Sequence, residues 1–394
     1  MPQYLSPGVY VEEVPGTPPI VGVGTSTAAF IGQVADDVPM PAKPDGSGNY
    51  TIAPKNESRL VTDFTQFKNQ FGDFHAKNLN LAHGIYGFFL NGGRRCWVAR
   101  TDDLTDAAQV GAILGKFEAN DEIAIVVAPG ARVVAVQQKI VDHCTKLADR
   151  FAILDGQVTT TIDKDVIRGE KPAAPPEPAV TPLGNSNYAA MYFPQIQVFD
   201  SVSRSNLYVP PSGHVAGIYA RVDALRGVHK APANEVVQGA LGLEYNLSKG
   251  EQDGLNPDGI NCIRNMNGNI RVWGARTLGG DANGEYKYVN VRRLINFLRE
   301  SIDEGTQFVV FEPNAPPLWQ RIKRSVTGFL TVVWRDGALF GNTAEEAFYV
   351  KCDESTNPPA VRDLGQVITE IGVAVVKPAE FVIFRISQIS GPGA

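Results

Sequence analysis

Apolar positions along the chain recur with two different spacings, and these spacings predict where strands and helices lie. Short apolar runs bounded by Gly, Pro or polar residues are typical of strands, whereas apolar residues three and four apart mark one face of a helix. Strands are therefore expected at residues 25–32, 96–99, 123–127, 151–154, 188–198 and 206–209. Helices are expected at residues 63–71, 79–90, 106–117, 133–147, 214–226, 289–302 and 318–333.

Strands and helices alternate between residues 96 and 154, which is the pattern of βαβ units with some parallel pairing. The predicted fold class is mixed α/β (α+β), with mixed β-sheets flanked by helices. Two segments, 38–57 and 157–187, are rich in Pro, Gly and polar residues, and we expect them to form surface excursions.

The two ends of the chain predict strands that have no local partner. Near the start, Val9, Tyr10, Val11 and Val14 lie between two Pro-Gly pairs; near the end, a run follows Lys377-Pro378. The apolar residues of this second run are Phe381, Val382, Ile383, Phe384 and Ile386. An apolar terminal strand needs a sheet edge, and that edge can belong to another copy of the chain. We therefore expect these residues to exchange strands between subunits.

The helix expected at residues 318–333 carries a basic side as well as an apolar stripe. Its stripe consists of Leu318, Ile322, Val326, Phe329, Leu330 and Val333. Arg321 and Arg324 fall roughly opposite the stripe, and Lys323 lies at its margin. The three cations form either an ordinary solvated face or a surface that docks onto an acidic partner.

Composition excludes several classes of protein. The 394 residues carry a formal net charge of −6, whereas a dedicated nucleic-acid binder normally has basic excess. No apolar stretch approaches the roughly 18–20 residues that cross a bilayer, and the first residues do not resemble a signal peptide. We therefore expect a protein of the cytoplasm, with no membrane insertion. Four cysteines far apart, without a CxxC pair, are expected to be buried thiols.

Motifs for catalysis or cofactor binding are missing from the sequence. The five histidines have no metal-ligand spacing, and there is no phosphate-binding loop. Ser212 stands two residues before His214, but without a nucleophile elbow it is expected to cap the following helix. We therefore predict no enzyme, no metal and no cofactor.

Trp273 and Arg276 lie in the segment Trp-Gly-Ala-Arg-Thr, which is interpreted as a structural core motif. The guanidinium of Arg276 can bind a carboxylate with two parallel hydrogen bonds. The sequence leaves open whether that carboxylate belongs to the same subunit or to a neighbour.

A series of ordered segments makes nearly the whole chain resemble contractile tail sheath proteins, in particular the short sheath subunits of extracellular contractile injection systems and R-type tailocins. The matching segments are 5–14, 22–32, 210–235, 259–264 (GINCIR), 272–278 (VWGARTL), 289–294 (VNVRRL), 311–314 (FEPN), 348–353 and 378–388 (PAEFVIFRISQ). Segments 38–57 and 157–187 match no pattern.

The resemblance implies a structural subunit that polymerises as stacked hexameric rings around an inner tube and contracts to drive the tube through a target envelope. Partners implied are other copies of the chain, the inner tube protein, and baseplate and terminator or cap proteins. The expected domains are an N-terminal arm (1–20), an outer α/β domain (21–230), an inner sheath core (231–376) and a C-terminal arm (377–394). Arg321, Lys323 and Arg324 are expected to contact the tube.

The resemblance also implies that the subunit assembles in the cytoplasm and then forms part of a phage-tail-like particle, either released or docked on an envelope. Two alternatives stay open. One is a tube or baseplate component of the same machine, and the other is an α/β enzyme of unknown chemistry, which only the βαβ stretch favours.

Overall fold

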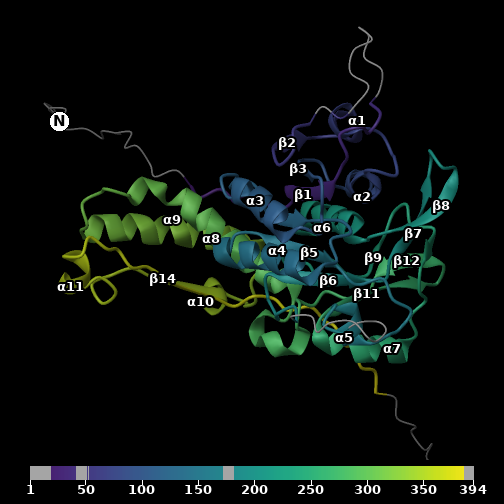
Figure 1. The fold of residues 1–394 in the computed structure, drawn as a ribbon. Coiled ribbons are helices and arrows are strands. Elements are labelled where there is room, and N and C mark those ends of the chain that lie inside the picture. The colour runs from purple at the N-terminus through teal and green to yellow at the C-terminus, as the bar shows by residue number, and fades with distance from the viewer. Residues whose placement is uncertain (1–18, 41–50, 52, 172–181, 386–394) are drawn as a thin grey trace, which may run out of the picture. The chain divides into compact units, whose positions relative to one another are not determined.

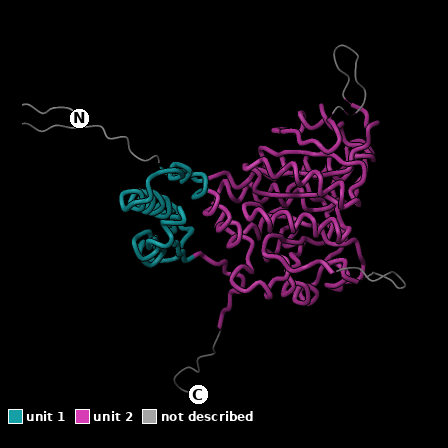
Figure 2. The backbone as a smooth tube through the Cα atoms, turned by 60° about the vertical axis from the view of Figure 1, so that its left-hand side comes forward, with its two compact units in different colours: residues 1–22, 301–374 teal, residues 23–300, 375–394 magenta. Residues whose placement is uncertain are grey.

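The computed structural model describes residues 19–40, 51, 53–171 and 182–385. The chain divides into two compact units (Figure 2). The large unit comprises residues 23–300 and 375–394, and the small unit comprises residues 1–22 and 301–374.

The large unit is built on a nine-stranded sheet with the order β2-β3-β1-β4-β5-β6-β11-β12-β9 (Figure 1). Six neighbouring strands, β3 to β11 in this order, run parallel, and the strands at both margins are antiparallel. The strands are β1 (Ala28–Gln33), β2 (Ser58–Val61), β3 (Cys96–Thr101), β4 (Ile125–Val127), β5 (Phe151–Asp155), β6 (Ala189–Phe193), β9 (Glu235–Val236), β11 (Ile260–Met266) and β12 (Asn269–Val272).

Helices cover both faces of this sheet. Successive strand residues point to opposite sides, and here the residues on both sides are apolar and need to be buried. Phe30 packs in a core with α1 (Phe64–Phe71), α2 (Leu79–Leu90) and α6 (Ser212–Arg226). The next residue, Ile31, packs in a second core with α3 (Ala107–Phe117) and α4 (Val134–Leu147). The result is a three-layer α/β unit whose parallel strands are buried on both faces, as such strands usually are.

Helices α2 and α6 approach each other closely because glycines line their contact. A Cβ atom on Gly213 would lie 2.4 Å from Cα of Gly84, so any larger residue at Gly213 would push the helices apart. Shorter elements complete the large unit. They are α5 (Lys164–Ile167), β7 (Ile196–Asp200), β8 (Ser205–Val209), β10 (Gly242–Leu243), α7 (Lys249–Leu255), and the 3-10 helices η1 (Asn256–Asp258) and η2 (Gly280–Tyr286). Strands β10, β7 and β8 form a separate antiparallel sheet.

The described part of the small unit contains the long amphipathic helix α9 (Pro316–Arg335) and a two-stranded antiparallel sheet. The whole predicted stripe of α9, from Leu318 to Val333, is buried. Its other elements are η3 (Gln307–Val309), α10 (Ala344–Ala347), β13 (Phe348–Lys351), α11 (Pro359–Arg362) and β14 (Glu370–Val373). Helix α8 (Val289–Gly305) begins in the large unit, and its last residues are counted with the small one.

The structure confirms the mixed α/β class and the helices expected between residues 25 and 333, with ends that differ by a few residues. The expected strands are confirmed in the same way, except that the segment 188–198 contains two strands: β6 in the large sheet and β7 in the separate antiparallel sheet. The compact units, however, do not divide at residue 230. Residues 260–266 form β11, which pairs with β6, so this part of the expected inner domain completes the large sheet. The expected excursion at 157–187 is also partly packed, since Ile167 and Leu183 are buried.

The prediction that Ser212 caps α6 is wrong, because Ser212 is the first residue of the helix. Its hydroxyl donates to Oδ2 of Asp155 at 2.7 Å, and its backbone N–H donates to Oδ1 at 3.0 Å. The buried Asp155 carboxylate therefore satisfies the start of α6 from the end of a neighbouring strand.

Candidate assembly arm and its anchor

The residues predicted to exchange strands fall partly outside the described chain. Val9, Tyr10, Val11 and Val14 at the start, and Ile386 at the end, are among the residues that the structure does not describe. The described part of the C-terminal arm runs to residue 385, and its residues 376–385 form no helix or strand.

Four consecutive apolar side chains of this arm face solvent. The exposed fractions are 70% for Phe381, 69% for Val382, 78% for Ile383 and 85% for Phe384. A single exposed apolar residue is ordinary, but a contiguous apolar run marks an interaction site. The described part of the predicted donor segment is thus exposed and pairs with no described strand.

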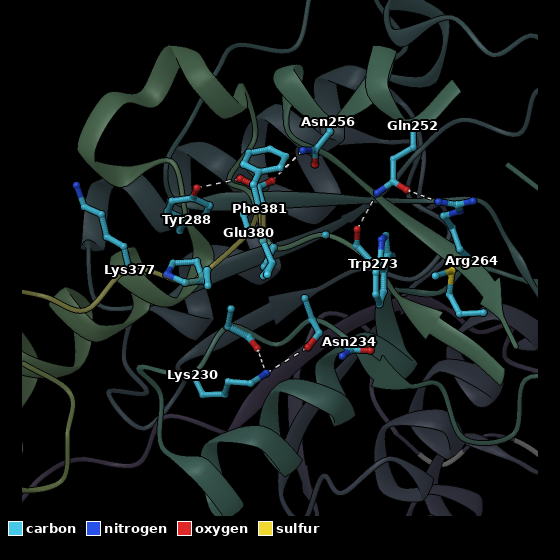
Figure 3. A pocket seen from close by; sticks show the side chains of 18 of the residues that line it. Lys230, Asn234, Gln252, Asn256, Arg264, Trp273, Tyr288, Lys377, Glu380 and Phe381 are labelled. Carbon is cyan, nitrogen blue, oxygen red and sulfur yellow. Dashed lines mark hydrogen bonds between the residues drawn. The ribbon is translucent and has the colours of Figure 1, made fainter. Parts of the chain in front are cut away.

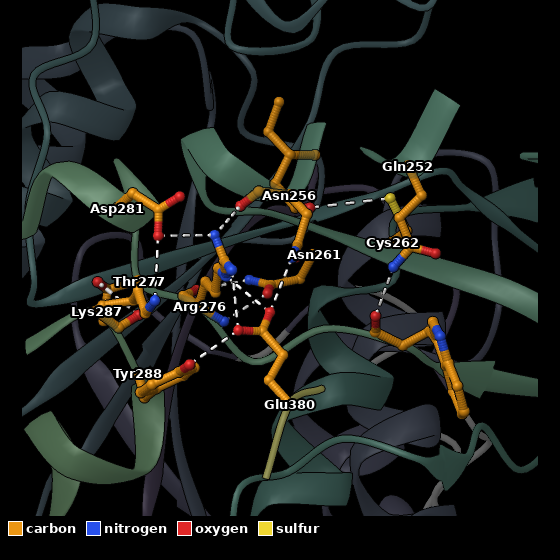
Figure 4. A network of polar contacts seen from close by, with 12 residues as sticks. Gln252, Asn256, Asn261, Cys262, Arg276, Thr277, Asp281, Lys287, Tyr288 and Glu380 are labelled. Carbon is orange, nitrogen blue, oxygen red and sulfur yellow. Dashed lines mark hydrogen bonds and ion pairs between the residues drawn. The ribbon is translucent and has the colours of Figure 1, made fainter. Parts of the chain in front are cut away.

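Glu380, immediately before this run, is held by three side chains (Figure 4). Its Oε1 accepts from Nε of Arg276 at 2.8 Å and from Nδ2 of Asn256 at 2.8 Å. Its Oε2 accepts from Nη2 of Arg276 at 2.9 Å and from the hydroxyl of Tyr288 at 2.9 Å. The two bonds from Arg276 are parallel, which is the strongest geometry for a guanidinium and a carboxylate.

Arg276 is buried and is itself fixed by the large sheet. Its backbone N–H donates to Oδ1 of Asn261 on β11, and its carbonyl accepts from Nδ2 of the same side chain, at 2.7 and 2.8 Å. Nη1 of Arg276 donates to the carbonyl of Asn256 at 3.1 Å and lies 3.1 Å from Oδ1 of Asp281. The guanidinium therefore has a fixed orientation next to β11, with Glu380 as its bidentate partner.

The charges of this network support each other. Burial favours the neutral acid at Glu380, but the hydrogen bonds from Arg276, Asn256 and Tyr288 outweigh it and hold the pKa of Glu380 below its usual value. Burial likewise opposes the charge on Arg276, and Glu380 more than compensates, so the pKa of Arg276 is raised. Of the two alternatives left open for Arg276, the structure shows an ion pair within the same chain.

A cavity of about 890 Å³ lies beside the arm (Figure 3). Residues 377–382 form part of its wall, and Trp273 lines it as well. The carbonyl of Trp273 accepts from Nε2 of Gln252 at 2.8 Å, which ties the loop after β12 to α7. Trp273 and Arg276 thus lie in one loop, which follows β12 and contacts the arm through Arg276.

The basic residues predicted to contact a tube all lie on α9 in the small unit. Lys323 and Arg324 are exposed, and among the described residues neither forms an ion pair. Arg321 differs, because its Nη1 lies 3.2 Å from Oε2 of Glu312 and its guanidinium lies 5.2 Å from the centre of the Phe308 ring. Two of the three cations are therefore available for a partner, and the third is partly neutralised.

Within the described ranges, no group of three or more His, Cys, Asp and Glu residues is placed to hold a metal ion. All four cysteines are buried, and burial raises the pKa of the Cys96, Cys144 and Cys262 thiols, so they are unreactive. No helix in the described part of the chain is long and apolar enough to span a membrane.

Two sequence profiles match this chain. The phage tail sheath protein central domain matches residues 101–278, and the phage tail sheath C-terminal domain matches residues 281–389. The chain belongs to the phage tail sheath family. Among curated tail sheath proteins, that of Vibrio phage KVP40 is 28% identical over 47% of this chain and 27% of its own length. That of Burkholderia phage BcepMu is 27% identical over 60% of this chain and 49% of its own length.

This sheath protein also matches solved structures over nearly its full length. The contracted helical sheath of the anti-feeding prophage (AFP) is 27% identical, with a TM-score of 0.77, over 97% of this chain and 99% of the other. The contracted sheath complex of the extracellular contractile injection system PVC is also 27% identical, with a TM-score of 0.77, over 99% of both chains. Although this chain spans half or less of the two phage relatives, it spans almost all of these shorter subunits.

The sequence analysis missed Glu380 as the partner of Arg276. A single glutamate that follows Pro378-Ala379 has no recognisable spacing to Arg276, 104 residues away. Its position as the only acidic residue between residues 371 and 394 was the one available signal.

Proposed function

We propose that this chain is a structural, non-catalytic subunit of a contractile sheath, which polymerises with other copies as stacked hexameric rings around an inner tube. Contraction of the sheath drives the tube through a target envelope. The observation that carries the proposal is the exposed apolar run from Phe381 to Phe384, which follows an anchored residue and pairs with no strand among the described residues.

The small sheet of another copy is the acceptor that suits such an arm. Among the described residues, β13 pairs with β14 and with no further strand, so each has an open edge. A two-stranded sheet is marginally stable alone, and a third strand adds backbone hydrogen bonds and apolar contacts. Strand exchange between subunits would pair the exposed run of the arm with an open edge of this small sheet. We extend the same role to Val9, Tyr10, Val11, Val14 and Ile386.

The energy available suits a permanent link. Burying an exposed Phe or Ile side chain contributes about 1.5–3 kcal/mol before ordering costs, and each new backbone hydrogen bond about 0.5–1.5 kcal/mol. An arm with four such side chains therefore forms a link comparable with the stability of a domain. Such links persist while the more polar contacts between subunit bodies rearrange. The free energy for contraction is stored when the extended lattice assembles, so contraction needs no cofactor.

The other proposed partners follow from the position of a sheath in a particle. They are the inner tube protein, which Arg321, Lys323 and Arg324 of α9 would contact, and baseplate and terminator or cap proteins at the two ends. We propose that assembly takes place in the cytoplasm and that the sheath then belongs to a phage-tail-like particle.

Ending the chain after Glu380 tests this function. We expect the shortened protein to keep the melting temperature of the full chain, because the described side chains that it lacks, residues 381–385, are exposed. We expect it to form no sheaths by negative-stain electron microscopy. It should still accept arms from other copies, so small amounts added to full chains should shorten the sheaths. Sheaths of normal length formed by the shortened chain alone would overturn the proposal.

A further inference from the structure

The segment from residue 376 to 385 is held in an unusual way. It belongs to no helix or strand, and no backbone hydrogen bond to residues 376–385 is among those of the described chain outside helices and strands. A terminal segment of this kind normally frays. Here one side chain, Glu380, makes four hydrogen bonds to three residues, and none of its neighbours in this segment has a comparable set.

The residues that bind Glu380 come from rigid parts of the large unit. Arg276 is fixed by β11 through Asn261, and the backbone of Tyr288 bridges to Arg276 immediately before α8. Asn256 begins η1. Side chains from three separate parts of the chain therefore bind one carboxylate, whereas an ordinary surface ion pair has a single partner.

The position of this carboxylate is as informative as its contacts. The exposed apolar run begins at the next residue, so the boundary between fixed and free chain lies between Glu380 and Phe381. Beyond Glu380 the described arm comprises residues 381–385, which at about 3.3 Å per extended residue reach at most roughly 17 Å from the anchor.

We propose that the Arg276–Glu380 ion pair is the pivot of the C-terminal arm. It fixes the arm to its own subunit, sets the direction and the free length of the donated strand, and transmits the pull between subunits during contraction. This inference rests on the proposed sheath function, and it makes Arg276 and Glu380 positioning residues for strand exchange.

The pivot can be tested first in the full chain kept below the concentration at which it assembles. Because all four native cysteines are buried, a nitroxide spin label on Ala379→Cys, an exposed position, reports on the arm alone. The label should give a broad, immobile spectrum in the otherwise unchanged chain. In the Glu380→Gln background the mobile fraction should rise about tenfold or more, since a hydrogen bond to a charged group contributes roughly 1.5–3 kcal/mol.

Asp281→Asn is the matched control. Asp281 contacts the same guanidinium at 3.1 Å but does not touch the arm, and its side chain is half exposed. We expect its spectrum to stay immobile. An immobile label in the Glu380→Gln chain, or equal loosening by both substitutions, would overturn the pivot, because the arm would then be held by other contacts.

Assembled sheaths supply the second readout. Glu380→Gln chains should still form sheaths, because residues 381–384 are intact, but contracted sheaths should break into shorter pieces than those of Asp281→Asn. Contracted Glu380→Gln sheaths as long as the control would overturn the mechanical role. A full chain that forms no sheath would instead overturn the proposed function, and the spin-label comparison would still decide whether Glu380 holds the arm.

Discussion

The large and small units differ in how completely each satisfies its own groups. In the large unit, a buried ion pair is complete: Nη2 of Arg293 lies 2.6 Å from Oδ2 of Asp223, with both side chains at most 5% exposed. Among the described residues of the small unit, two strands have open edges, and apolar side chains such as Leu364 (74%) and Phe311 (fully exposed) face solvent. Phe311 also has a φ of 66°, which is unfavourable for a bulky residue.

This difference distinguishes a unit that satisfies its own buried groups from a unit that is completed by contacts with other copies. A buried ion pair is tolerated only when its geometry is complete, as it is for Arg293. Open strand edges are a liability in a monomer, but they are useful in a polymer whose subunits add strands to one another. We therefore expect substitutions in the large unit to change folding, and substitutions in the arm and the small unit to change assembly.

The largest effect should come from breaking the buried ion pair of the large unit. Arg293→Met leaves the Asp223 carboxylate buried without its partner, which should lower the free energy of unfolding by about 3–5 kcal/mol in urea titrations. Adding Asp223→Leu should recover part of this loss, because the uncompensated charge is gone. Arg299→Met, at an exposed position on the same helix, is the control and should change stability by less than about 0.5 kcal/mol.

Acid should destabilise the large unit through its buried histidines. Burial lowers the pKa of His214 from 6.5 to about 3 and that of His143 to about 4. Between the unfolded and folded values the unfolded chain binds more protons, so stability is full above pH 6.5 and falls as the pH drops toward 3. For His214 alone the loss at pH 4 should be roughly 3 kcal/mol.

Urea titrations between pH 7 and pH 4 measure this loss. His214→Asn removes the titrating group, and its stability should depend less steeply on pH than that of the unchanged chain. His75→Asn, in which a less buried imidazole is replaced, is the matched control and should keep the full slope. Equal slopes for His214→Asn and the unchanged chain would show that His214 is not the source.

Local elements could be predicted from the sequence, whereas contacts between distant residues could not. Regular spacing predicted most helices and most parallel strands of the large unit, together with helix α9 of the small one, because a βαβ pattern and a helical stripe are local signals. It did not predict the sheet of β13 and β14. The hairpin of β11 and β12 was missed, although Asn267-Gly268 with positive φ at both residues is a common hairpin turn. The Glu380 anchor was also missed, because contacts between residues far apart in the chain leave no periodic signal.

A moderate effect, confined to assembly, is expected from the arm. Phe381→Ser combined with Ile383→Ser should leave the melting temperature unchanged and raise the concentration needed for sheath formation about 100-fold, taking only about 1.4 kcal/mol per lost contact. Leu225→Ser replaces an apolar residue of similar exposure (74%) in the large unit, outside the arm, and controls for general surface polarity. Light scattering against concentration measures both. An equal shift by the control would mean that the arm has no special role.

The smallest effect on folding, and the most specific test of the small unit, concerns the basic side of α9. Lys323→Glu with Arg324→Glu reverses two exposed charges that make no ion pair among the described residues, so stability should change by less than about 0.5 kcal/mol. If these cations bind an acidic tube surface, sheath formation on tubes should weaken, and added salt should narrow the difference from the unchanged chain.

Arg335→Glu, exposed at the far end of the same helix, is the control for net charge. Adding Arg321→Glu should contribute less than either of the first two, because Glu312 already neutralises part of that charge. Unchanged assembly of the triple variant on tubes would exclude α9 as the tube contact and leave its basic side as a solvated surface.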